Sequence, residues 1–182
     1  MASYIYQHNG IALKALEPYD TSLVYEAEND PLNLAYNGFT APYSARQLLE
    51  YALSYSADPV ADRQLRLIGI DIADDTPVGI IDLTDIDMRS LTAIVGVYVF
   101  PDRRRQGWSV KLIEAAVEYA KSVLRINRFA AKAAADNEAS IRMLHRAGFV
   151  EIGRFTDWLY SPATARNVDL LLMQKPASDP RK

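Results

Sequence analysis

Apolar positions in the middle of the chain alternate between helical and strand-like spacing. Five of them recur at intervals of three and four residues: Val110, Ile113, Val117, Ala120 and Leu124. This periodicity predicts a helix whose apolar stripe packs on a sheet. Apolar runs of strand length stand before and after it, at residues 93–100 and 129–134. Because a helical crossover joins these two predicted strands, we expect them to be parallel.

The N-terminal segment predicts a strand followed by a capped helix. Residues 11–16 form an apolar run of strand length, and Asp20 stands where an N-cap would precede a helix over residues 21–28. The sequence Asn29-Asp30-Pro31 is expected to end this helix.

A second capped helix and a hairpin are expected next. Ser44 and Gln47 have the spacing of a capping box, which predicts a helix that continues to about residue 56. Two apolar runs follow at residues 65–72 and 78–83, joined by a short polar segment. This arrangement predicts two antiparallel strands with a tight connection.

The C-terminal part predicts one more helix and a late strand. Ile141, Leu144 and Phe149 would give the helix its buried edge, and residues 168–173 are apolar at strand length. The polar stretch at 156–167 is interpreted as a surface loop. The order of elements therefore predicts an α/β fold with a central mixed sheet flanked by helices.

Composition limits the class of protein. With 182 residues, 49% of them hydrophobic, we expect one domain over residues 1–182 with a short polar tail at 176–182. The chain has no cysteine and two histidines, which argues against disulfides, a thiolate nucleophile and a metal site. No apolar run approaches membrane-spanning length and no N-terminal signal is evident, so we expect a cytoplasmic protein without a membrane partner. A net charge of -3 argues against nucleic-acid binding.

The polar turn before the helix with this apolar stripe carries the main candidate chemistry. Arg103-Arg104-Arg105-Gln106-Gly107 leads from an apolar strand into this helix. A helix N-terminus leaves about four N–H groups unpaired and holds roughly half a positive charge, which suits a pyrophosphate. Gly107 would let the backbone approach the anion closely. On its own, such a turn is more often a solvated cap than a phosphate site.

A second motif follows 30 residues after Gly107, from Asn137 to the pair Gly148-Phe149. Together the two motifs resemble the paired signatures of the GNAT N-acetyltransferase superfamily, over roughly residues 11–173. The resemblance is stronger toward the branch of spermidine N-acetyltransferases and ribosomal-protein N-terminal acetyltransferases. It implies the GNAT acyl-CoA N-acyltransferase fold, with acetyl-CoA as co-substrate and no metal.

The resemblance also implies a set of site residues. The strand before the loop would bind the pantetheine arm through the backbone of Val97 and Val99, with Val99 near the reacting thioester oxygen. Ser109 stands where the family usually has glycine or alanine. Trp108 could pack beside the cofactor, but a half-buried packing anchor explains it better. The predicted cofactor-binding residues are Val97, Val99, Arg104, Arg105, Gln106, Gly107, Trp108, Ser109, Asn137 and Arg146.

The acid and base are harder to assign, because two positions depart from the family pattern. Leu144 replaces the usual tyrosine acid and Ile94 a frequent glutamate, while His145 is expected to face solvent. Asp82 aligns with an acidic position of the spermidine branch, where it would bind a cationic acceptor or relay its proton. Glu26, Glu28 and Asp30 form a further acidic run, which is more often simply solvated.

The resemblance implies an acetyl-CoA-dependent N-acetyltransferase in which a primary amine attacks the thioester directly. The acceptor stays open between a polyamine such as spermidine and a protein or peptide N-terminal amine. The alternative is a non-catalytic acyl-CoA-binding sensor or degenerate GNAT domain. A homo-oligomer is compatible with the sequence, which does not specify one.

Overall fold

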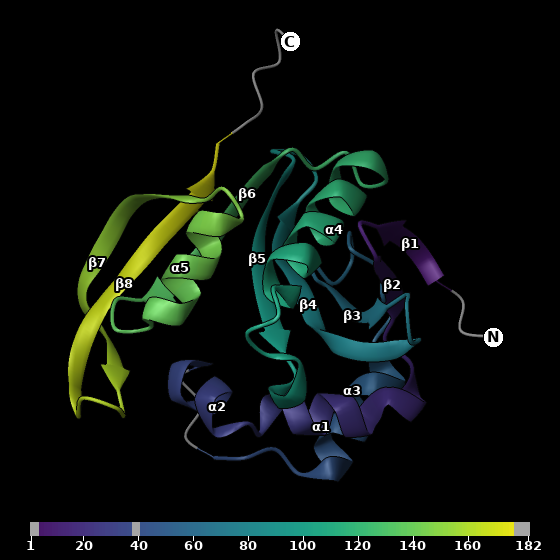
Figure 1. The fold of residues 1–182 in the computed structure, drawn as a ribbon, viewed down its shortest axis with the longest axis horizontal. Coiled ribbons are helices and arrows are strands. Elements are labelled where there is room, and N and C mark those ends of the chain that lie inside the picture. The colour runs from purple at the N-terminus through teal and green to yellow at the C-terminus, as the bar shows by residue number, and fades with distance from the viewer. Residues whose placement is uncertain (1–3, 38–40, 177–182) are drawn as a thin grey trace, which may run out of the picture.

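A computed structural model describes residues 4–37 and 41–176, and its strands form one mixed sheet (Figure 1). The strand order is β1-β2-β3-β4-β5-β6-β8-β7. The strands are β1 (Tyr4–His8), β2 (Ile11–Ala15), β3 (Leu65–Asp71), β4 (Thr76–Asp87), β5 (Thr92–Val99), β6 (Arg128–Ala134), β7 (Val150–Ser161) and β8 (Arg166–Lys175). The α-helices are α1 (Thr21–Glu28), α2 (Pro31–Asn37), α3 (Ala45–Ser54), α4 (Trp108–Ser122) and α5 (Glu138–Arg146), with 3-10 turns η1 (Pro18–Asp20) and η2 (Pro101–Arg103). This architecture confirms the predicted fold class.

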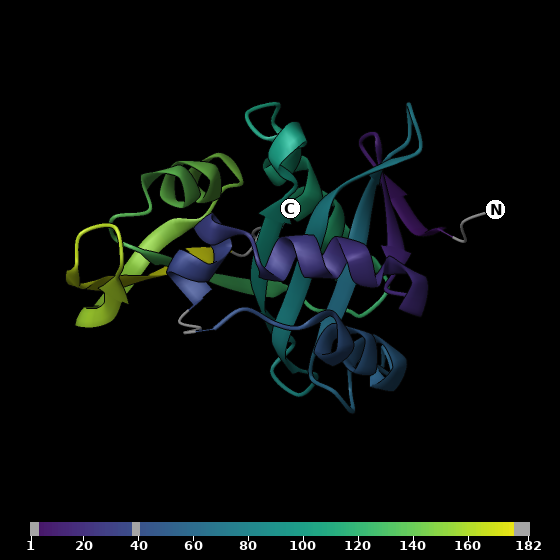
Figure 2. The same ribbon diagram turned by 90° about the horizontal axis from the view of Figure 1, so that it is seen from below.

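Helices cover both faces of the sheet, so it has two apolar layers. Figure 2 shows α3 and α4 on opposite sides of the strands. On the α4 face, Leu112, Ile113 and Val117 are almost completely buried in the larger core. On the other face, Val24 of α1 and Leu48 of α3 pack with apolar side chains of β2, β3 and β4. The predicted apolar stripe of α4 is thus confirmed. The buried face of the helix is wider than this stripe, because it also includes Leu112, Ala115 and Ala116.

β5 and β6 are parallel, as the crossover through α4 required, and they pair over only a short stretch. The register joins Thr92 to Arg128, Ala93 to Phe129 and Ile94 to Ala130. In Figure 1, β6, β8, β7 and α5 diverge from the half of the sheet that contains β5. A parallel pair that ends after three residues leaves the rest of both strands free to separate.

The helix at 21–28 was predicted correctly, but its capping residue was not. Asp20 makes no side-chain cap bond to α1. Its carboxylate instead accepts from Lys14 Nζ at 2.7 Å and from the Glu17 N–H at 3.0 Å. Lys14 is buried, at 8% exposed. An unpaired buried ammonium would cost more free energy than a missing helix cap, so Asp20 pairs with Lys14. Pro31 also does more than end α1, because it begins α2.

The prediction of a surface loop at 156–167 is wrong. β7 continues to Ser161, and a short turn leads into β8 at Arg166. β7 is an edge strand with most of its residues exposed, so its polarity resembles that of a loop. The strand β1, at the opposite edge, was also missed; it has only five residues, and none of them is fully buried. The hairpin of β3 and β4 and the capping box of Ser44 with Gln47 are confirmed.

Candidate active site

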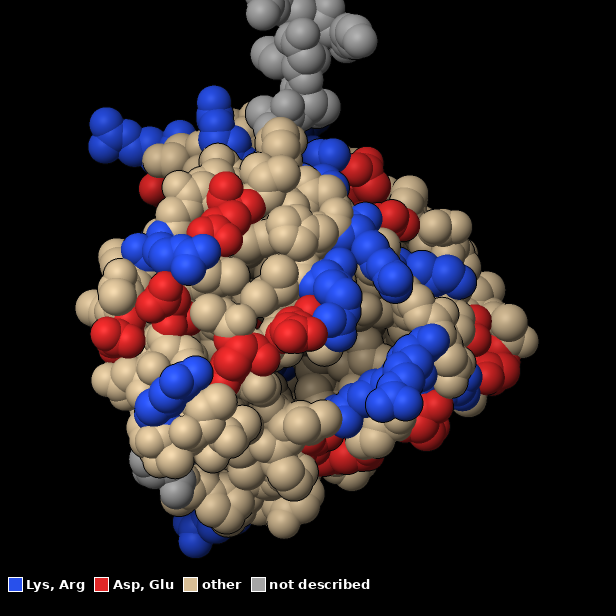
Figure 3. Space-filling view, turned by 60° about the vertical axis from the view of Figure 1, so that its left-hand side comes forward, with Lys and Arg blue, Asp and Glu red and all other residues tan. Residues whose placement is uncertain are grey.

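The separation of β5 from β6 opens a cavity of about 770 Å³ through the sheet. Its walls come from β3 to β6 and from helices on both faces. One end is lined by Asn137, Ser140 and Leu144 of the α5 region, and the other by Glu28 of α1 and Tyr51 of α3. On the face shown in Figure 3, acidic and basic side chains both border the central hollow. The cavity thus connects the α5 side of the sheet with the α1 side.

The backbone of β5 presents hydrogen-bonding groups to this gap. The Phe100 N–H donates to the Val78 carbonyl at 3.1 Å, so these opposite residues form a hydrogen-bonded pair of the β4–β5 ladder. Hydrogen-bonded and non-hydrogen-bonded pairs alternate along an antiparallel ladder. The β4–β5 register is regular from the pair Gly79–Val99 to the pair Thr84–Ile94. The N–H and C=O groups of Val95, Val97 and Val99 therefore point away from β4, toward the gap. The backbone groups of Val97 and Val99 thus point in the direction that their predicted role in cofactor binding requires.

The turn before α4 has the open geometry of an anion site. Gly107 is the N-cap of α4 with φ +85°, and no atom lies within 4 Å of where a Cβ would stand. Arg105 also has positive φ, at 63°. This left-handed backbone exposes the N–H groups of the first turn, and α4 is long enough to add its dipole. The turn has room for a phosphate group close to its backbone.

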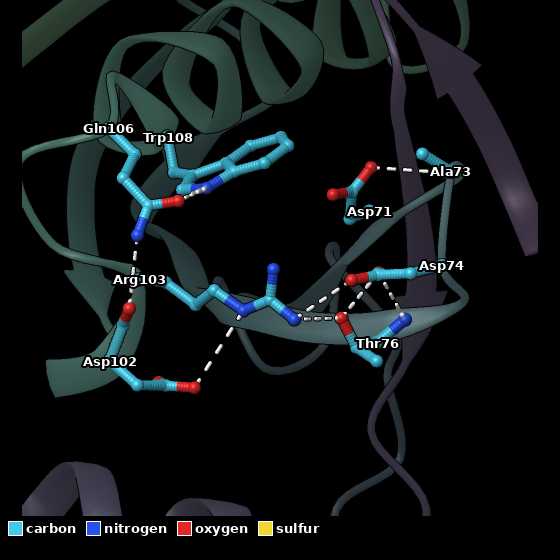
Figure 4. A network of polar contacts seen from close by, with 8 residues as sticks. All are labelled: Asp71, Ala73, Asp74, Thr76, Asp102, Arg103, Gln106 and Trp108. Carbon is cyan, nitrogen blue, oxygen red and sulfur yellow. Dashed lines mark hydrogen bonds and ion pairs between the residues drawn. The ribbon is translucent and has the colours of Figure 1, made fainter.

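The three arginines of this turn have different surroundings. Arg103 pairs with Asp74 at 3.0 Å and donates to Thr76 (Figure 4). Arg104 pairs with the buried Asp30, and its Nε donates to the Val99 carbonyl at 3.0 Å. Arg105 is exposed and makes no ion pair with the described residues. The structure therefore favours Arg105 as the guanidinium available to a phosphate, because Arg104 already has protein partners.

The remaining side chains of the turn support the loop itself. Gln106 donates to the Asp102 carbonyl at 3.0 Å and accepts from the Trp108 indole at 3.2 Å (Figure 4). Trp108 packs on the larger core, and Lys111 lies over its ring at 4.4 Å. Ser109 is half-buried in the first turn of α4. The packing role expected for Trp108 is present, and contact with a cofactor stays a prediction.

Asn137 and Arg146 lie at opposite ends of α5. Asn137 caps the helix by accepting from the Ser140 N–H at 3.0 Å, and it also lines the cavity. Arg146 is the last residue of the helix, and it is exposed. A nine-residue helix is about 13 Å long, which separates the two side chains widely. The structure thus brings Asn137 to the gap and leaves Arg146 away from it.

A buried ion cluster lies at the α1 end of the cavity. Arg66 of β3 contacts Asp82 through Nε at 2.7 Å and Nη2 at 3.0 Å, and contacts Glu28 through Nη1 at 2.7 Å. The three side chains are between 12% and 21% exposed. Burial acts to lower the pKa of the Arg66 guanidinium, but the adjacent Asp82 and Glu28 carboxylates outweigh it and raise that pKa. Arg66 is therefore a permanent cation.

Tyrosines surround this cluster. The Tyr51 hydroxyl is buried and has no hydrogen-bond partner among the described residues, although the side chain lines the cavity. Its ring stacks on Tyr55 at 5.5 Å between centroids. The Tyr55 hydroxyl accepts from the Arg66 N–H at 2.6 Å, and burial raises the pKa of Tyr55 to about 12. Tyr51 is thus the polar group of this cluster that lacks a protein partner.

Sequence reasoning did not find Arg66 or Tyr51. Asp82 was predicted from the family resemblance, and Glu28 was named only as part of an acidic run. No local motif could have indicated the cluster, because its members come from α1, α3, β3 and β4 and meet only through strand register. Regular alternation along β4 would place the side chains of Asp82 and Asp85 on opposite faces. An irregular register after Thr84 leaves Asp85 exposed with φ 48°.

The Acetyltransferase (GNAT) domain family matches residues 11–150. The chain belongs to the GNAT acetyltransferase family. It is an N-acetyltransferase by family, which confirms the resemblance carried by its paired motifs. Spermidine N(1)-acetyltransferase of Vibrio cholerae is 22% identical over 147 residues, covering 81% of this chain and 83% of that protein. An uncharacterised N-acetyltransferase of Bacillus subtilis, YoaA, is 24% identical over 173 residues, covering 94% and 97%.

Solved structures share this GNAT fold. A crystal structure of spermidine N-acetyltransferase from Vibrio cholerae in complex with CoA and spermine has a TM-score of 0.79 at 22% identity, covering 92% of this chain and 95% of that one. A dodecameric structure of the Vibrio cholerae enzyme has a TM-score of 0.73 at 22% identity, covering 92% and 94%. At this identity, the similarity establishes the fold.

One position that departs from the family pattern lies in the cavity wall. Leu144 is 3% exposed and lines the cavity, so an apolar group stands where relatives carry tyrosine. His145 is exposed, with Nδ1 3.1 Å from the Phe149 carbonyl oxygen, and does not line the cavity. Ser140 and four tyrosines supply the hydroxyl groups of the cavity wall: Tyr36, Tyr43, Tyr51 and Tyr98.

Within residues 4–37 and 41–176, no group of three His, Asp or Glu side chains is arranged to hold a metal ion. The helices in these same ranges are too short or too polar to cross a membrane.

Proposed function

We propose that this chain transfers the acetyl group of acetyl-CoA to a primary amine by direct attack of the amine on the thioester. The observation that carries the proposal is the cavity between β5 and β6, which is lined by residues from both faces of the sheet. One substrate would enter from the α5 side, called here the cofactor side. The other would enter from the α1 side, called here the acceptor side. The two would meet beside the backbone of β5.

The cofactor side has groups suited to each part of coenzyme A. The N-terminus of α4 at Gly107 would bind the pyrophosphate through backbone N–H groups, with the Arg105 side chain beside it. Gln106, Trp108 and Ser109 would support this loop. The backbone groups of Val97 and Val99 would bind the pantetheine arm and the thioester oxygen. If the phosphates are bound mainly by backbone N–H groups, the site does not depend on the side chains at positions 104 and 109. Arg104 can then bond to Asp30 and Val99, and serine can occupy position 109.

A contact with the cofactor is better supported for Asn137 than for Arg146. Asn137 uses its carbonyl oxygen to cap α5, which leaves its amide N–H groups for the pantetheine arm. Arg146 lies at the far end of that helix, so a phosphate contact from it would require a ligand group near the α5 C-terminus. We therefore retain both predictions and rank Asn137 first.

The bound acetyl-CoA supplies an electrophilic carbon, whose bond to sulfur breaks as the bond to the amine nitrogen forms. The amine must lose a proton, and Asp82 is positioned to accept it through water because its oxygens retain lone pairs beyond their bonds to Arg66. The Val99 backbone would polarise the thioester carbonyl. Leu144 cannot donate a proton, so water would protonate the departing thiolate.

A non-catalytic acyl-CoA-binding sensor is the second candidate, favoured by Leu144 and Ile94 in place of the usual acid and base. Release of free thiol from acetyl-CoA, measured with a mixed panel of amines, separates the two. An enzyme releases coenzyme A only when an amine is present. Binding of coenzyme A, measured by a shift in melting temperature, without amine-dependent thiol release would support the sensor.

A further inference from the structure

The charged side chains that line the cavity balance one another. Glu28 and Asp82 are negative, Arg66 and Lys132 are positive, and the cavity wall has no other charged residue in the described chain. Arg66 lies between the two carboxylates and cannot lose its charge. The wall therefore lacks the excess negative charge that a polyamine with three or four positive charges would require.

The cavity has open space beside Asp82, above Gly96. A Cβ built on Gly96, directly across the β4–β5 ladder, would lie 3.8 Å from the Asp82 Cβ, with no closer atom. Gly96 itself has no side chain to fill this space, and both residues line the cavity. One ammonium group could therefore reach Asp82 from the gap beside β5. A second ammonium further along the cavity would meet Arg66, which repels it.

The Tyr51 hydroxyl adds a second recognition group. It is buried without a partner, and a buried polar group without a hydrogen bond costs free energy. The Arg66 guanidinium carbon lies 5.6 Å from the centroid of the Tyr51 ring, so the hydroxyl belongs to the same part of the cavity as the ion cluster. An acceptor with an oxygen close to its amine would satisfy this hydroxyl.

We propose that Arg66 selects a singly charged primary amine with a neighbouring hydrogen-bonding oxygen, as in a peptide α-amine, and disfavours polyamines. This inference rests on the proposed function and concerns the acceptor side of the same cavity. The ammonium binds near Asp82 before it loses its proton, and the Tyr51 hydroxyl hydrogen-bonds to the carbonyl oxygen of the first residue. Arg66 and Lys132 keep the wall from attracting further positive charge.

The test compares kcat/KM for spermidine with kcat/KM for an uncharged tripeptide amide with N-terminal serine. The wild-type enzyme is expected to prefer the peptide at least tenfold. Arg66→Gln should shift the ratio toward spermidine by about tenfold, because it leaves both carboxylates without a cation. Arg66→Lys keeps the charge and should keep the preference for the peptide. Arg46→Gln removes an arginine that is 86% exposed on α3, so it controls for net charge and should not move the ratio.

Arg66→Gln removes a buried charge and can fail to fold, so Lys132→Gln provides a second route. Lys132 is exposed on β6 and lines the cavity, and its neutralisation should shift the ratio toward spermidine by about threefold. Tyr51→Phe should raise KM for the peptide at least threefold and leave KM for an alkyl monoamine without oxygen unchanged. This split between substrates distinguishes a contact with the acceptor from a general loss of structure.

The outcomes separate this inference from the proposed function. Amine-dependent thiol release with spermidine preferred by the wild-type enzyme would overturn the role of Arg66 while leaving the acetyltransferase intact. A ratio that stays unchanged in both Arg66→Gln and Lys132→Gln would also overturn it. Absence of thiol release with every amine would instead contradict the proposed function.

Discussion

The cofactor side and the acceptor side of β5 are built in different ways. The proposed cofactor side presents backbone groups of consecutive residues, in the turn at Gly107 and along β5. The acceptor side uses side chains from separate elements, brought together around Arg66. Backbone recognition survives many side-chain replacements, whereas a side-chain cluster changes its charge with a single substitution. We therefore expect the chain to follow its family on the cofactor side and to differ from its relatives on the acceptor side.

The largest expected effect is on the acceptor side, where the ion cluster contributes to stability. Arg66→Ala leaves Glu28 and Asp82 partly buried without a cation, and breaking such a pair costs about 3 kcal/mol in the free energy of unfolding. Arg46→Ala removes a partner of Glu50 in an exposed pair, which should cost less than about 1 kcal/mol. Urea unfolding of the three proteins measures the difference. Equal losses for the two variants would show that the Arg66 cluster does not stabilise the fold.

The next largest effect concerns the cofactor side. Coenzyme A at about 100 times its dissociation constant should stabilise the wild-type protein by about 2.7 kcal/mol. Gly107→Val should abolish this stabilisation, because a branched side chain at φ +85° would occupy the open space over the turn. Differential scanning fluorimetry with and without coenzyme A measures the shift.

Gly10 offers a matched control for the strain of a branched residue at positive φ. It has φ +82° and open space at its Cβ, but it lies in the β1–β2 turn. Gly10→Val should destabilise the apo protein to a similar extent and still respond fully to coenzyme A. A full response in Gly107→Val as well would exclude the turn as the phosphate site.

A third prediction concerns Asp30. This residue lies between α1 and α2, and its carboxylate pairs with Arg104 in the turn before α4. Burial acts to raise the pKa of the Asp30 carboxyl, but hydrogen bonds from Arg104, Tyr98 and the Leu32 N–H outweigh it and hold that pKa below its ordinary value. A carboxyl with a lowered folded-state pKa contributes stability above its unfolded pKa of about 3.9 and loses it as pH falls through the folded value.

Asp30→Asn should therefore destabilise the protein by about 1–2 kcal/mol at neutral pH, since it weakens charged hydrogen bonds. The difference from wild type should shrink as pH falls below about 4, where the carboxyl of the unfolded chain begins to take up a proton, until the folded carboxyl is protonated as well. Unfolding measured between pH 3 and pH 7 would show this convergence. A difference that is constant with pH would mean that the charge of Asp30 contributes nothing.

Asp82 gives a kinetic prediction for the acceptor side. Asp82→Asn should raise KM for a charged amine, because an ammonium bound equally in the ground state and the transition state contributes uniform binding. If Asp82 also relays the proton, kcat falls as well, and the deficit shrinks as pH rises and more amine is neutral. Asp85→Asn, at an exposed residue of the same strand, should change neither constant. Unchanged kcat/KM for every accepted amine in Asp82→Asn would remove Asp82 from the site.

The smallest effect is expected at His145. Its side chain is exposed and outside the cavity, so His145→Ala should lower the acetylation rate by less than about tenfold, below the roughly 100-fold contribution of a positioned acid. Steady-state rates at saturating acetyl-CoA provide the measurement. A hundredfold loss with intact folding and cofactor affinity would identify His145 as the acid and weaken the role given to water.

The sequence by itself determined the elements whose signals are local. The periodicity of α4, the capping box of Ser44, the hairpin of β3 and β4 and the position of Gly107 each depend on residues within one or two turns or strands. The parallel pairing of β5 with β6 followed from the crossover between them. The edge strand β7 escaped prediction because most of its residues are exposed, so burial does not impose an apolar alternation on it. The edge strand β1 escaped prediction because its five residues are too few to give a clear pattern.

Only the tertiary structure decided which side chains pair across the fold. Arg104 lies 74 residues from Asp30, and Arg66 joins Glu28 to Asp82 across three elements. Such partners depend on strand register and on how a helix seats on the sheet, which no short motif encodes. The open turn at Gly107, where we propose that the cofactor binds, could therefore be predicted from its local motif, whereas the charge of the proposed acceptor side depends on how the strands pair.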